Sequence, residues 1–218
     1  VMKLLQDKVA LITGASKGIG RGIALKFAQQ GADVAFTYLS SVEQGEALVA
    51  ELAAFGVKAK GYRSDASDAK QADELINAVA ADFGKIDVLI NNAGMLEKKM
   101  RLDQMDLGRW QRVLNANVIG SFLCAKEAVL RMSTLHGGKG GAIVNLSSAA
   151  ARLGSPNEFI DYAAAKGAVD SMTIGLSKEV ATEGIRVNAV RPGLIYTDIH
   201  TSAGEPGRVD RAKAGVPM

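Results

Sequence analysis

Tyr162 and Lys166 are the residues whose types and spacing most directly suggest chemistry. They stand four positions apart in a segment with a helical pattern, and the three residues between them are alanines. Side chains four apart share one face of a helix, so the lysine ammonium can lie beside the tyrosine phenol. A tyrosine pKa of about 10 leaves little phenolate at neutral pH, and a nearby positive charge lowers that pKa. The pair therefore indicates general acid–base chemistry, and we expect the alanines to leave room for ligands against that face.

Polar residues also close two expected strands. Ser147 and Ser148 end the run "GAIVNLSS", and the segment 91–94, "NNAG", ends another apolar run. Open α/β sheets bind ligands at the carboxyl ends of their strands, so both sets are candidates for one site. Asn117 lies in a long apolar helical pattern, where a lone asparagine is more often a solvent-facing or capping residue.

Three glycines follow the first expected strand and open the first expected helix. Gly14, Gly18 and Gly20 have the spacing G-x-x-x-G-x-G. Glycines at such a turn let backbone N–H groups approach a pyrophosphate, which then sits at the positive end of a helix. A purely structural turn is the alternative, but the position directly after the first strand favours a bound dinucleotide.

The end of the second expected strand indicates which dinucleotide. NAD sites usually carry a carboxylate about 20 residues past the glycines, to hold the ribose 2′-OH. Here the strand ends "FTYLSS", with Tyr38 and Ser40 but no acid. Lys17, inside the glycine turn, can offer a cation to a 2′-phosphate, although it could equally be a solvated turn lysine. NADP(H) is therefore favoured over NAD(H).

Short apolar strands alternate with amphipathic helices along the whole chain. Such alternation implies right-handed βαβ units and a mostly parallel sheet covered on both faces. The fold class is therefore α/β, a single doubly wound Rossmann-type domain over residues 1–218. The expected strands are 8–14, 33–39, 58–65, 86–94, 141–148 and 185–193, and the expected helices are 18–31, 41–56, 67–84, 110–132 and one that begins at Tyr162.

The overall composition argues against several other classes of protein. The chain has 218 residues, a formal charge of +3 and one cysteine, Cys124, expected to be a small buried hydrophobe. This mild charge argues against nucleic acid as a partner, and a single cysteine fits a reducing compartment. No apolar stretch reaches the ~18 residues of a membrane span, so we expect a cytoplasmic protein. His136 and His200 are expected to be exposed loop residues, and no metal site is predicted.

The combined pattern resembles the short-chain dehydrogenase/reductase family. The motifs occur in the family's order over nearly the whole chain: "TGASKGIG" at 13–20, "NNAG", Asn117, Ser148, Tyr162-x-x-x-Lys166, and "RPG" at 191–193. Each motif is common by itself, but the ordered set is specific.

The resemblance implies a role for each catalytic residue. Tyr162 would give a proton to a carbonyl oxygen, or take one from an alcohol. Lys166 would lower the pKa of Tyr162 and bind the nicotinamide ribose. Ser148 would hold the substrate oxygen, with Ser147 as its competitor, and Asn117 would position a water that relays protons. The resemblance also implies a set of cofactor-binding residues, namely Gly14, Ser16, Lys17, Gly18, Ile19, Gly20, Tyr38, Ser40, Asp65, Ala66, Asn91, Ala93, Gly94, Tyr162, Lys166, Pro192, Gly193, Ile195 and Thr197.

Three functions are compatible with these residues. The first is an NADP(H)-dependent oxidoreductase that interconverts a carbonyl and a secondary alcohol on a small molecule. The second is a 3-oxoacyl-acyl-carrier-protein reductase, which the region before residue 91 resembles; its acidic carrier would need a basic rim, for which Lys139 and Lys178 are candidates. The segment 122–211 instead resembles sugar or polyol dehydrogenases. The third, of another class, is a non-catalytic dinucleotide-binding or scaffold protein.

The resemblance carries two further expectations about architecture. Residues from about 195 to 218 should form a cap or loop over the substrate cleft, and the family's usual C-terminal helix and strand are not present in this sequence. The chain is expected to form a homo-oligomer, either a dimer or a tetramer.

Overall fold

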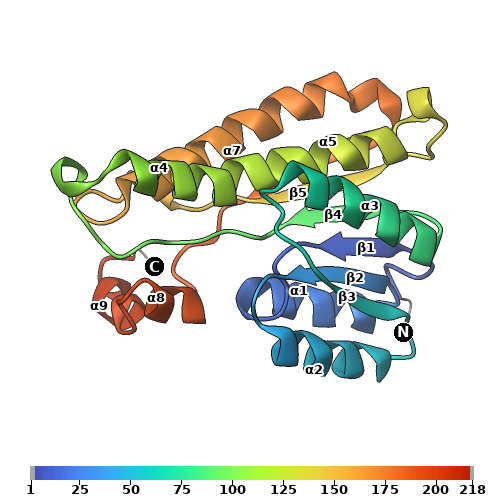
Figure 1. Cartoon of the computed structure of the whole chain (residues 1–218), viewed down its shortest axis with the longest axis horizontal. Helices are drawn as coiled ribbons and strands as arrows, with labels where there is room; N and C mark the ends of the chain where they lie inside the picture. The colour runs from blue at the N-terminus through green and yellow to red at the C-terminus, as the bar shows by residue number, and fades with distance from the viewer. Residues whose placement is uncertain (1–2, 217–218) are drawn as a thin grey trace.

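Six parallel strands form one sheet in this computed structural model, which describes residues 3–216 (Figure 1). Every strand pair is parallel, with Leu11 opposite Ala35 of β2 and Leu89 of β4. This confirms the predicted fold class. The order across the sheet is β3-β2-β1-β4-β5-β6, and the strands are β1 (Val9–Ile12), β2 (Asp33–Tyr38), β3 (Ala59–Arg63), β4 (Val88–Asn91), β5 (Gly141–Leu146) and β6 (Ile185–Val190).

Helices cover both faces of the sheet. Helices α1 and α2 lie below it in Figure 1, whereas α3, α5 and α7 lie above it. The first layer packs on β1, β2 and β3, and the second packs on β1, β4, β5 and β6. The helices of these layers are α1 (Gly18–Gln29), α2 (Val42–Ala53), α3 (Ala69–Phe83), α4 (Leu107–Leu114), α5 (Gly120–Met132) and α7 (Ile160–Glu179).

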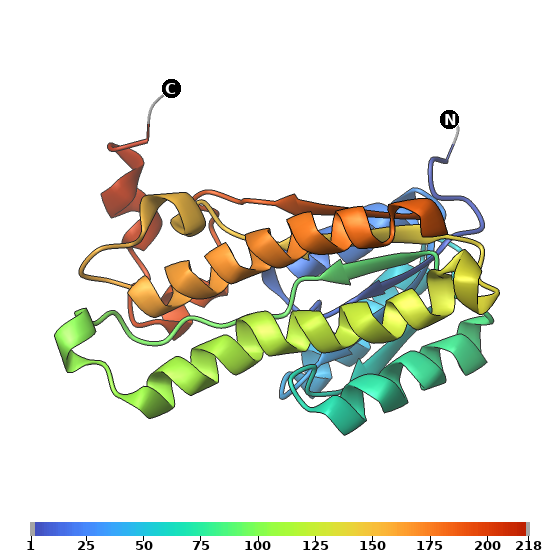
Figure 2. The ribbon, with the colours of Figure 1, turned by 90° about the horizontal axis from the view of Figure 1, so that it is seen from above.

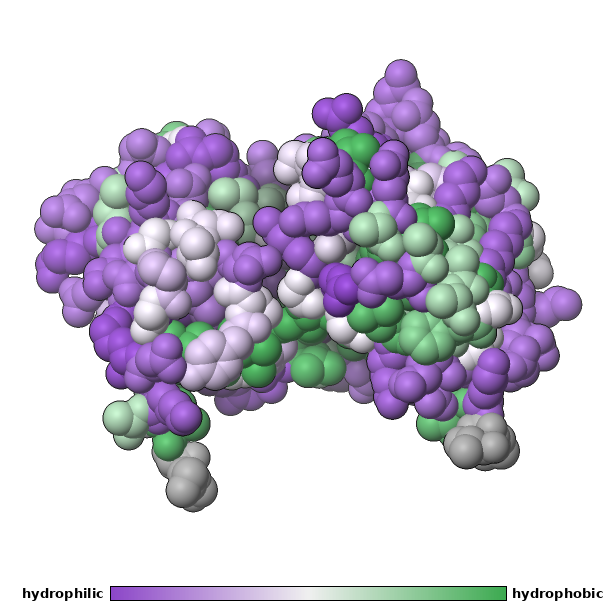
Figure 3. Space-filling model, turned by 90° about the horizontal axis from the view of Figure 1, so that it is seen from below, coloured by the Kyte–Doolittle hydropathy of each residue, from purple (hydrophilic) through white to green (hydrophobic). Residues whose placement is uncertain are grey.

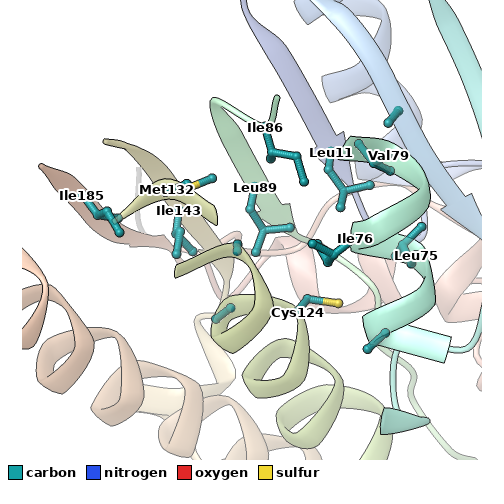
Figure 4. Packing of buried hydrophobic residues seen from close by; sticks show 14 of the residues in the cluster. Leu11, Leu75, Ile76, Val79, Ile86, Leu89, Cys124, Met132, Ile143 and Ile185 are labelled. Carbon is teal, nitrogen blue, oxygen red and sulfur yellow. The ribbon is translucent and has the colours of Figure 1, made fainter. Parts of the chain in front are cut away.

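The core between the sheet and the upper helices is built from the apolar strands that the sequence predicted. Leu89 of β4 and Ile143 of β5 are fully buried, and Ile76 of α3 and Cys124 of α5 face them from the helices (Figure 4). Burial raises the pKa of the Cys124 thiol to about 12. Cys124 is therefore the small buried hydrophobe that we expected, because so weak an acid carries no thiolate at neutral pH.

The strand order places a crevice between β1 and β4. From β1 the chain runs outward to β2 and β3, and it then returns to the other side of β1 and continues through β4, β5 and β6 (Figure 2). Such a reversal leaves a gap between the connections at the carboxyl ends of the strands, where open α/β sheets bind ligands. The fold thus predicts a ligand site next to the segments that follow Ile12, the end of β1, and Asn91, the end of β4.

The structure corrects the sequence analysis at several element boundaries. Helix α7 begins at Ile160, two residues before Tyr162. Three short helices were not predicted, namely α6 (Ala150–Leu153), α8 (Asp198–Ser202) and α9 (Arg208–Lys213). They are too short for hydrophobic periodicity to reveal, because a helical pattern needs more than ten residues to be recognised.

One continuous helical segment, Leu107–Met132, comprises α4, a π-helical turn and α5. Contrary to the sequence expectation, this segment is long and apolar enough to pass a membrane-span test, with a mean hydropathy of 1.3 over its best window. Of that window, 44% is buried inside the domain. Core helices of globular proteins pass the same test, and the contacts of α5 with α3 and the sheet place it in that class.

Candidate active site

The glycine turn forms one end of a cleft of about 890 Å³ at the carboxyl edge of the sheet. Gly14 and Gly18 have φ angles of +64° and +58°, in the left-handed region that favours glycine. A Cβ at Gly14 would stand 2.9 Å from the Cα of Ala93, so a side chain would fill the space between β1 and β4. The absence of a side chain at Gly14 therefore lets the turn pack closely on the segment after β4, while the turn itself lines the cleft.

Helix α1 opens onto this turn with its backbone donors available. Its N-cap residue, Lys17, makes no side-chain capping hydrogen bond, and the first turn of the helix contains no acidic residue. The N–H groups of a helix start have no intrahelical acceptor and carry a partial positive charge. This arrangement fits a pyrophosphate, and Lys17 lines the same cleft with its side chain exposed.

Tyr162, Ser148 and Lys166 converge at the other end of the cleft. The Lys166 ammonium is buried, donates to the carbonyl of Leu146 at 2.6 Å, and lies 5.5 Å from the centre of the Tyr162 ring. The Ser148 hydroxyl accepts from the amide of Ala150 at 3.1 Å, which leaves its own proton free for donation. The Ser147 hydroxyl instead donates to the carbonyl of Lys166 at 3.2 Å and is buried, so Ser148 is the serine that can serve a ligand.

The electrostatics differ from the sequence expectation. Burial raises the pKa of Tyr162 above its ordinary value, and the Ser148 hydroxyl and the charge of Arg208 partly oppose this shift. Burial lowers the pKa of Lys166 to about 8, while the charge of Asp170 acts in the opposite direction. The expectation that Lys166 lowers the pKa of Tyr162 is therefore not met in this structure, in which the ammonium points to a carbonyl oxygen.

The alanines between Tyr162 and Lys166 have a different role from the predicted one. Ala163 and Ala165 are buried and do not line the cleft, whereas Ala164 is exposed. Helix α7 packs against α4 and the π-helical turn. The small side chains therefore permit close helix packing rather than leave room for a ligand.

Asn117 is fully buried in the π-helical turn Asn115–Ile119. Its amide group donates to the carbonyls of Met95 and Val113, at 3.0 and 2.9 Å, and its Oδ1 accepts from the amide of Met95 at 3.2 Å. The side chain therefore holds the segment after β4 in place. A Cβ at Gly94 would stand 2.5 Å from Asn117 Oδ1 and 3.6 Å from Lys166 Nζ, so these three residues meet at one point.

Most predicted site residues lie together in the cleft, and two do not. Gly20 is buried within α1 against Asn92, and a Cβ there would stand 2.4 Å from the Asn92 amide nitrogen. Asn91 is buried behind the cleft, where it donates to Asn145 Oδ1 at 2.9 Å. The predicted residues that line the cleft are Gly14, Ser16, Lys17, Gly18, Ile19, Tyr38, Ser40, Asp65, Ala66, Ala93, Gly94, Asn117, Ser148, Tyr162, Lys166, Pro192, Gly193, Ile195 and Thr197.

The sequence analysis missed two residues that shape the glycine turn. Asn92 donates to the carbonyls of Thr13 and Gly14 at 2.9 and 2.8 Å, and Thr37 accepts from the amide of Gly14 at 2.9 Å. Both residues line the cleft. Asn92 lay within the quoted "NNAG" and could have been found there, whereas Thr37 reads as an ordinary strand residue.

The C-terminal segment forms the far wall of the cleft, and Figure 3 shows a hollow between this part of the molecule and the part that carries α1 and α2. Arg208 of α9 pairs with Glu158 at 3.0 Å and lies 4.8 Å from the ring centre of Phe159. His200 is buried in α8, and its Nε2 lies 3.0 Å from the carbonyl oxygen of Ile195. The prediction that His200 is an exposed loop residue is therefore wrong, because α8 turns it inward; His136 is exposed as predicted.

A glycine cradle at a helix start and a Tyr–Ser–Lys group at the other end of one cleft are the parts that a dinucleotide-dependent oxidoreductase needs. The chain matches the short chain dehydrogenase family over residues 8–207, and it belongs to that family. It is therefore an NAD(P)-dependent enzyme rather than the non-catalytic protein considered above.

Individual relatives agree with this family. The chain is 49% identical over 210 residues to the uncharacterised oxidoreductase YgfF of Escherichia coli (strain K12), covering 96% of this chain and 85% of the relative. It is 40% identical over 192 residues to the 3-oxoacyl-acyl-carrier-protein reductase FabG of Staphylococcus aureus (strain Mu50), covering 88% and 76%. A crystal structure of a short chain dehydrogenase from Burkholderia cenocepacia J2315 in complex with NADP matches with a TM-score of 0.84 and 37% identity, covering 96% and 81%.

Gly94→Ala should test the meeting point of Asn117 and Lys166. The new methyl group must displace the Asn117 side chain, so we expect the free energy of unfolding to fall by about 1–3 kcal/mol in urea titrations. Gly175→Ala on the exposed face of α7 meets no atom within 4 Å and should instead stabilise the helix, by up to about 1 kcal/mol. Equal effects of the two substitutions would contradict the packing described here.

Proposed function

We propose that the enzyme interconverts a carbonyl and a secondary alcohol on a small molecule by hydride transfer, with Tyr162 as general acid and base. The observation that carries this proposal is the convergence of Tyr162, Ser148 and Lys166 at one end of the cleft that begins at the Gly14–Gly18 turn. A phenol, a hydroxyl and an ammonium at one point can hold an oxygen atom and exchange a proton with it.

Each of these side chains has its own role in the proposed reaction. In the reducing direction, the hydroxyl groups of Ser148 and Tyr162 bind the carbonyl oxygen, and Tyr162 gives up its proton as that oxygen becomes an alcohol. The raised pKa of Tyr162 keeps the phenol protonated at neutral pH, ready to donate. The hydroxyl of Ser148 and the charge of Arg208 then favour the phenolate that remains, whereas the Lys166 ammonium is bonded to the carbonyl of Leu146 in this structure.

A nicotinamide dinucleotide, when bound, supplies or accepts the hydride. The Gly14–Gly18 turn and the start of α1 would hold its pyrophosphate, and Tyr162 and Lys166, which line the same cleft, would bind its nicotinamide ribose. Asn117 would act through Met95 and Gly94, which it holds beside Lys166.

We further propose that the enzyme prefers NADP(H). Tyr38 and Ser40 line the cleft where β2 ends, and the cleft-lining residues at that strand end include no carboxylate. Lys17 lines the same region with an exposed ammonium, which is available to a 2′-phosphate. The NADP complex of the Burkholderia cenocepacia relative supports the same preference.

A 3-oxoacyl group on acyl carrier protein is the second candidate substrate, because relatives at 40% identity carry that name. The proposed basic rim does not favour it. Lys139 precedes β5 and Lys178 lies in the last turn of α7, so both lie at the edge of the sheet opposite to the cleft. This candidate therefore rests on the relatives, and a comparison of free ketones with the acyl-carrier thioester as substrates distinguishes the two.

The remaining proposals concern assembly, domain organisation and location. Apolar side chains of the π-helical turn, α5 and α7 are 40–55% exposed, which supports a homo-oligomer through these helices; they are Ile119, Phe122, Leu130 and Ile174. Residues 195–216 wall the cleft, which supports their role as a cap within a single domain. A lone, buried cysteine supports a cytoplasmic location.

Tyr162→Phe tests the central assignment. Loss of the phenolic proton donor should lower the rate of NADPH oxidation by a factor of about 10² to 10⁴. This rate is followed at about 340 nm with a panel of carbonyls. The dissociation constant of NADPH should stay within severalfold of the parent value, because the glycine turn is untouched. Normal turnover by this variant would refute the role of Tyr162.

Lys17→Ala tests the cofactor preference. Removing this ammonium should weaken the binding of NADPH by about tenfold, since a charge-assisted phosphate contact contributes about 1.4 kcal/mol or more, and it should leave NADH binding within twofold. Nicotinamide fluorescence titrations measure both. Lys70→Ala, which removes an exposed cation on α3, should change neither. An equal loss of affinity for both dinucleotides would contradict a contact between Lys17 and the 2′-phosphate.

A further inference from the structure

Two buried charges next to the active site take no part in the mechanism above. Within residues 3–216, the only buried Asp, Glu, Lys or Arg residues are Arg109, Asp161 and Lys166. Arg109 and Asp161 form an ion pair, with 2.6 Å between Nε and Oδ2 and 3.4 Å between Nη2 and Oδ1. Their side chains are only 4% and 1% exposed. A buried ion pair contributes little net stability compared with an apolar pair of similar volume, so its presence here calls for another explanation.

The guanidinium of Arg109 joins two segments that border the cleft. Arg109 belongs to the first turn of α4, where its amide donates to the N-cap Asp106 at 2.7 Å. Its Nη1 donates to the carbonyl of Lys98 at 2.5 Å and lies 3.9 Å from the sulfur of Met100. The same guanidinium thus holds both α7, through Asp161, and the segment between β4 and α4.

Asp161 also contacts Tyr162 directly. Its Oδ1 accepts a hydrogen bond from the backbone amide of Tyr162 at 2.9 Å. Helix α7 starts at Ile160, and its N-cap Phe159 makes no side-chain capping bond. The amide of Tyr162 is therefore one of the first-turn donors that have no intrahelical acceptor, and a carboxylate is favoured at this end of a helix.

We propose that the Arg109–Asp161 pair is a positioning device for Tyr162, which fixes the first turn of α7 against α4 and so sets where the phenol stands in the cleft. This proposal rests on the function proposed for Tyr162. Arg109 and Asp161 touch neither reacting atoms nor the cleft, so they act through the Tyr162 backbone. Their directional hydrogen bonds specify one orientation of the helix start, which apolar packing between α4 and α7 would not do.

Two double variants separate positioning from stability. Arg109→Met/Asp161→Leu replaces the pair by apolar side chains and removes the acceptor for the Tyr162 amide. Arg109→Met/Asp161→Asn also removes the charges but keeps an oxygen next to that amide. Arg21→Met/Glu51→Gln is the matched control, because it removes an exposed ion pair between α1 and α2, far from Tyr162. For each protein, the measurements are kcat with NADPH and a ketone, the dissociation constant of NADPH, the thermal unfolding midpoint, and amide hydrogen exchange in the peptide 157–166.

We expect kcat of the Met/Leu variant to fall by about tenfold to a hundredfold, as a misplacement of about 1 Å would cause. NADPH binding and the unfolding midpoint should stay close to the parent values, and exchange in the peptide 157–166 should accelerate. The Met/Asn variant should recover most of the lost kcat, and the control should match the parent. If the Met/Leu variant does not fold, Arg109→Lys replaces it in the comparison, because lysine keeps a buried cation but not the paired contacts. Its kcat should lie between that of the parent and the tenfold to hundredfold loss expected for the Met/Leu variant.

Three results would overturn the proposal. The first is a Met/Leu variant with the kcat and the amide hydrogen exchange of the parent. The second is a Met/Asn variant whose kcat is as low as that of the Met/Leu variant, and the third is a fall in kcat that is fully explained by a smaller folded fraction. Failure of the proposed function is recognised separately, because the parent protein would then show no turnover with any carbonyl. The exchange comparison between the Leu and Asn variants still decides the positioning claim in that case.

Discussion

The site depends on one buried ammonium. Lys166 is 4% exposed and donates to a carbonyl oxygen at the end of β5, and burial lowers its pKa to about 8. Taking a charge out of water costs several kcal/mol unless its surroundings compensate. The neighbours of Lys166 are therefore constrained: Gly94 leaves space for the Asn117 side chain, Asn117 holds the backbone of that segment, and the Ser147 hydroxyl bonds to the carbonyl of Lys166 itself.

The fold delivers these groups from separate parts of the chain. Strand β5 brings Leu146 to the carboxyl edge of the sheet, β4 brings Gly94, and the π-helical turn brings Asn117 to the same point. A π-helical turn is uncommon and is frequently found at functional sites. Here the irregular turn directs the Asn117 side chain to the segment after β4. At the opposite end of the cleft, the proposed dinucleotide would be bound by the backbone of the glycine turn, the start of α1 and the Lys17 side chain.

Local spacing and strand order explain how far the sequence could predict the site. The Gly14–Gly18 turn and the Tyr162–Lys166 pair are local patterns, and their positions next to predicted strands placed them at one sheet edge. Asn91 and Gly20 belong to the same motifs but face the interior, because motif membership does not specify which way a side chain points. The direction of the Tyr162 pKa shift could not be predicted from the sequence either. It depends on burial and on Arg208, which lies 46 positions further along the chain. The partnership of Arg109 with Asp161, 52 positions apart, follows only from the packing of α4 on α7.

The most direct test of the central claim is a titration of the Lys166 ammonium. Lysines labelled with ¹³C at Cε can be followed by NMR as the pH rises, and the resonance that is missing from Lys166→Met identifies the residue. We predict a midpoint of about 8, as burial requires. A midpoint near 10.5, the value of an ordinary lysine, would contradict a buried ammonium at the centre of this site.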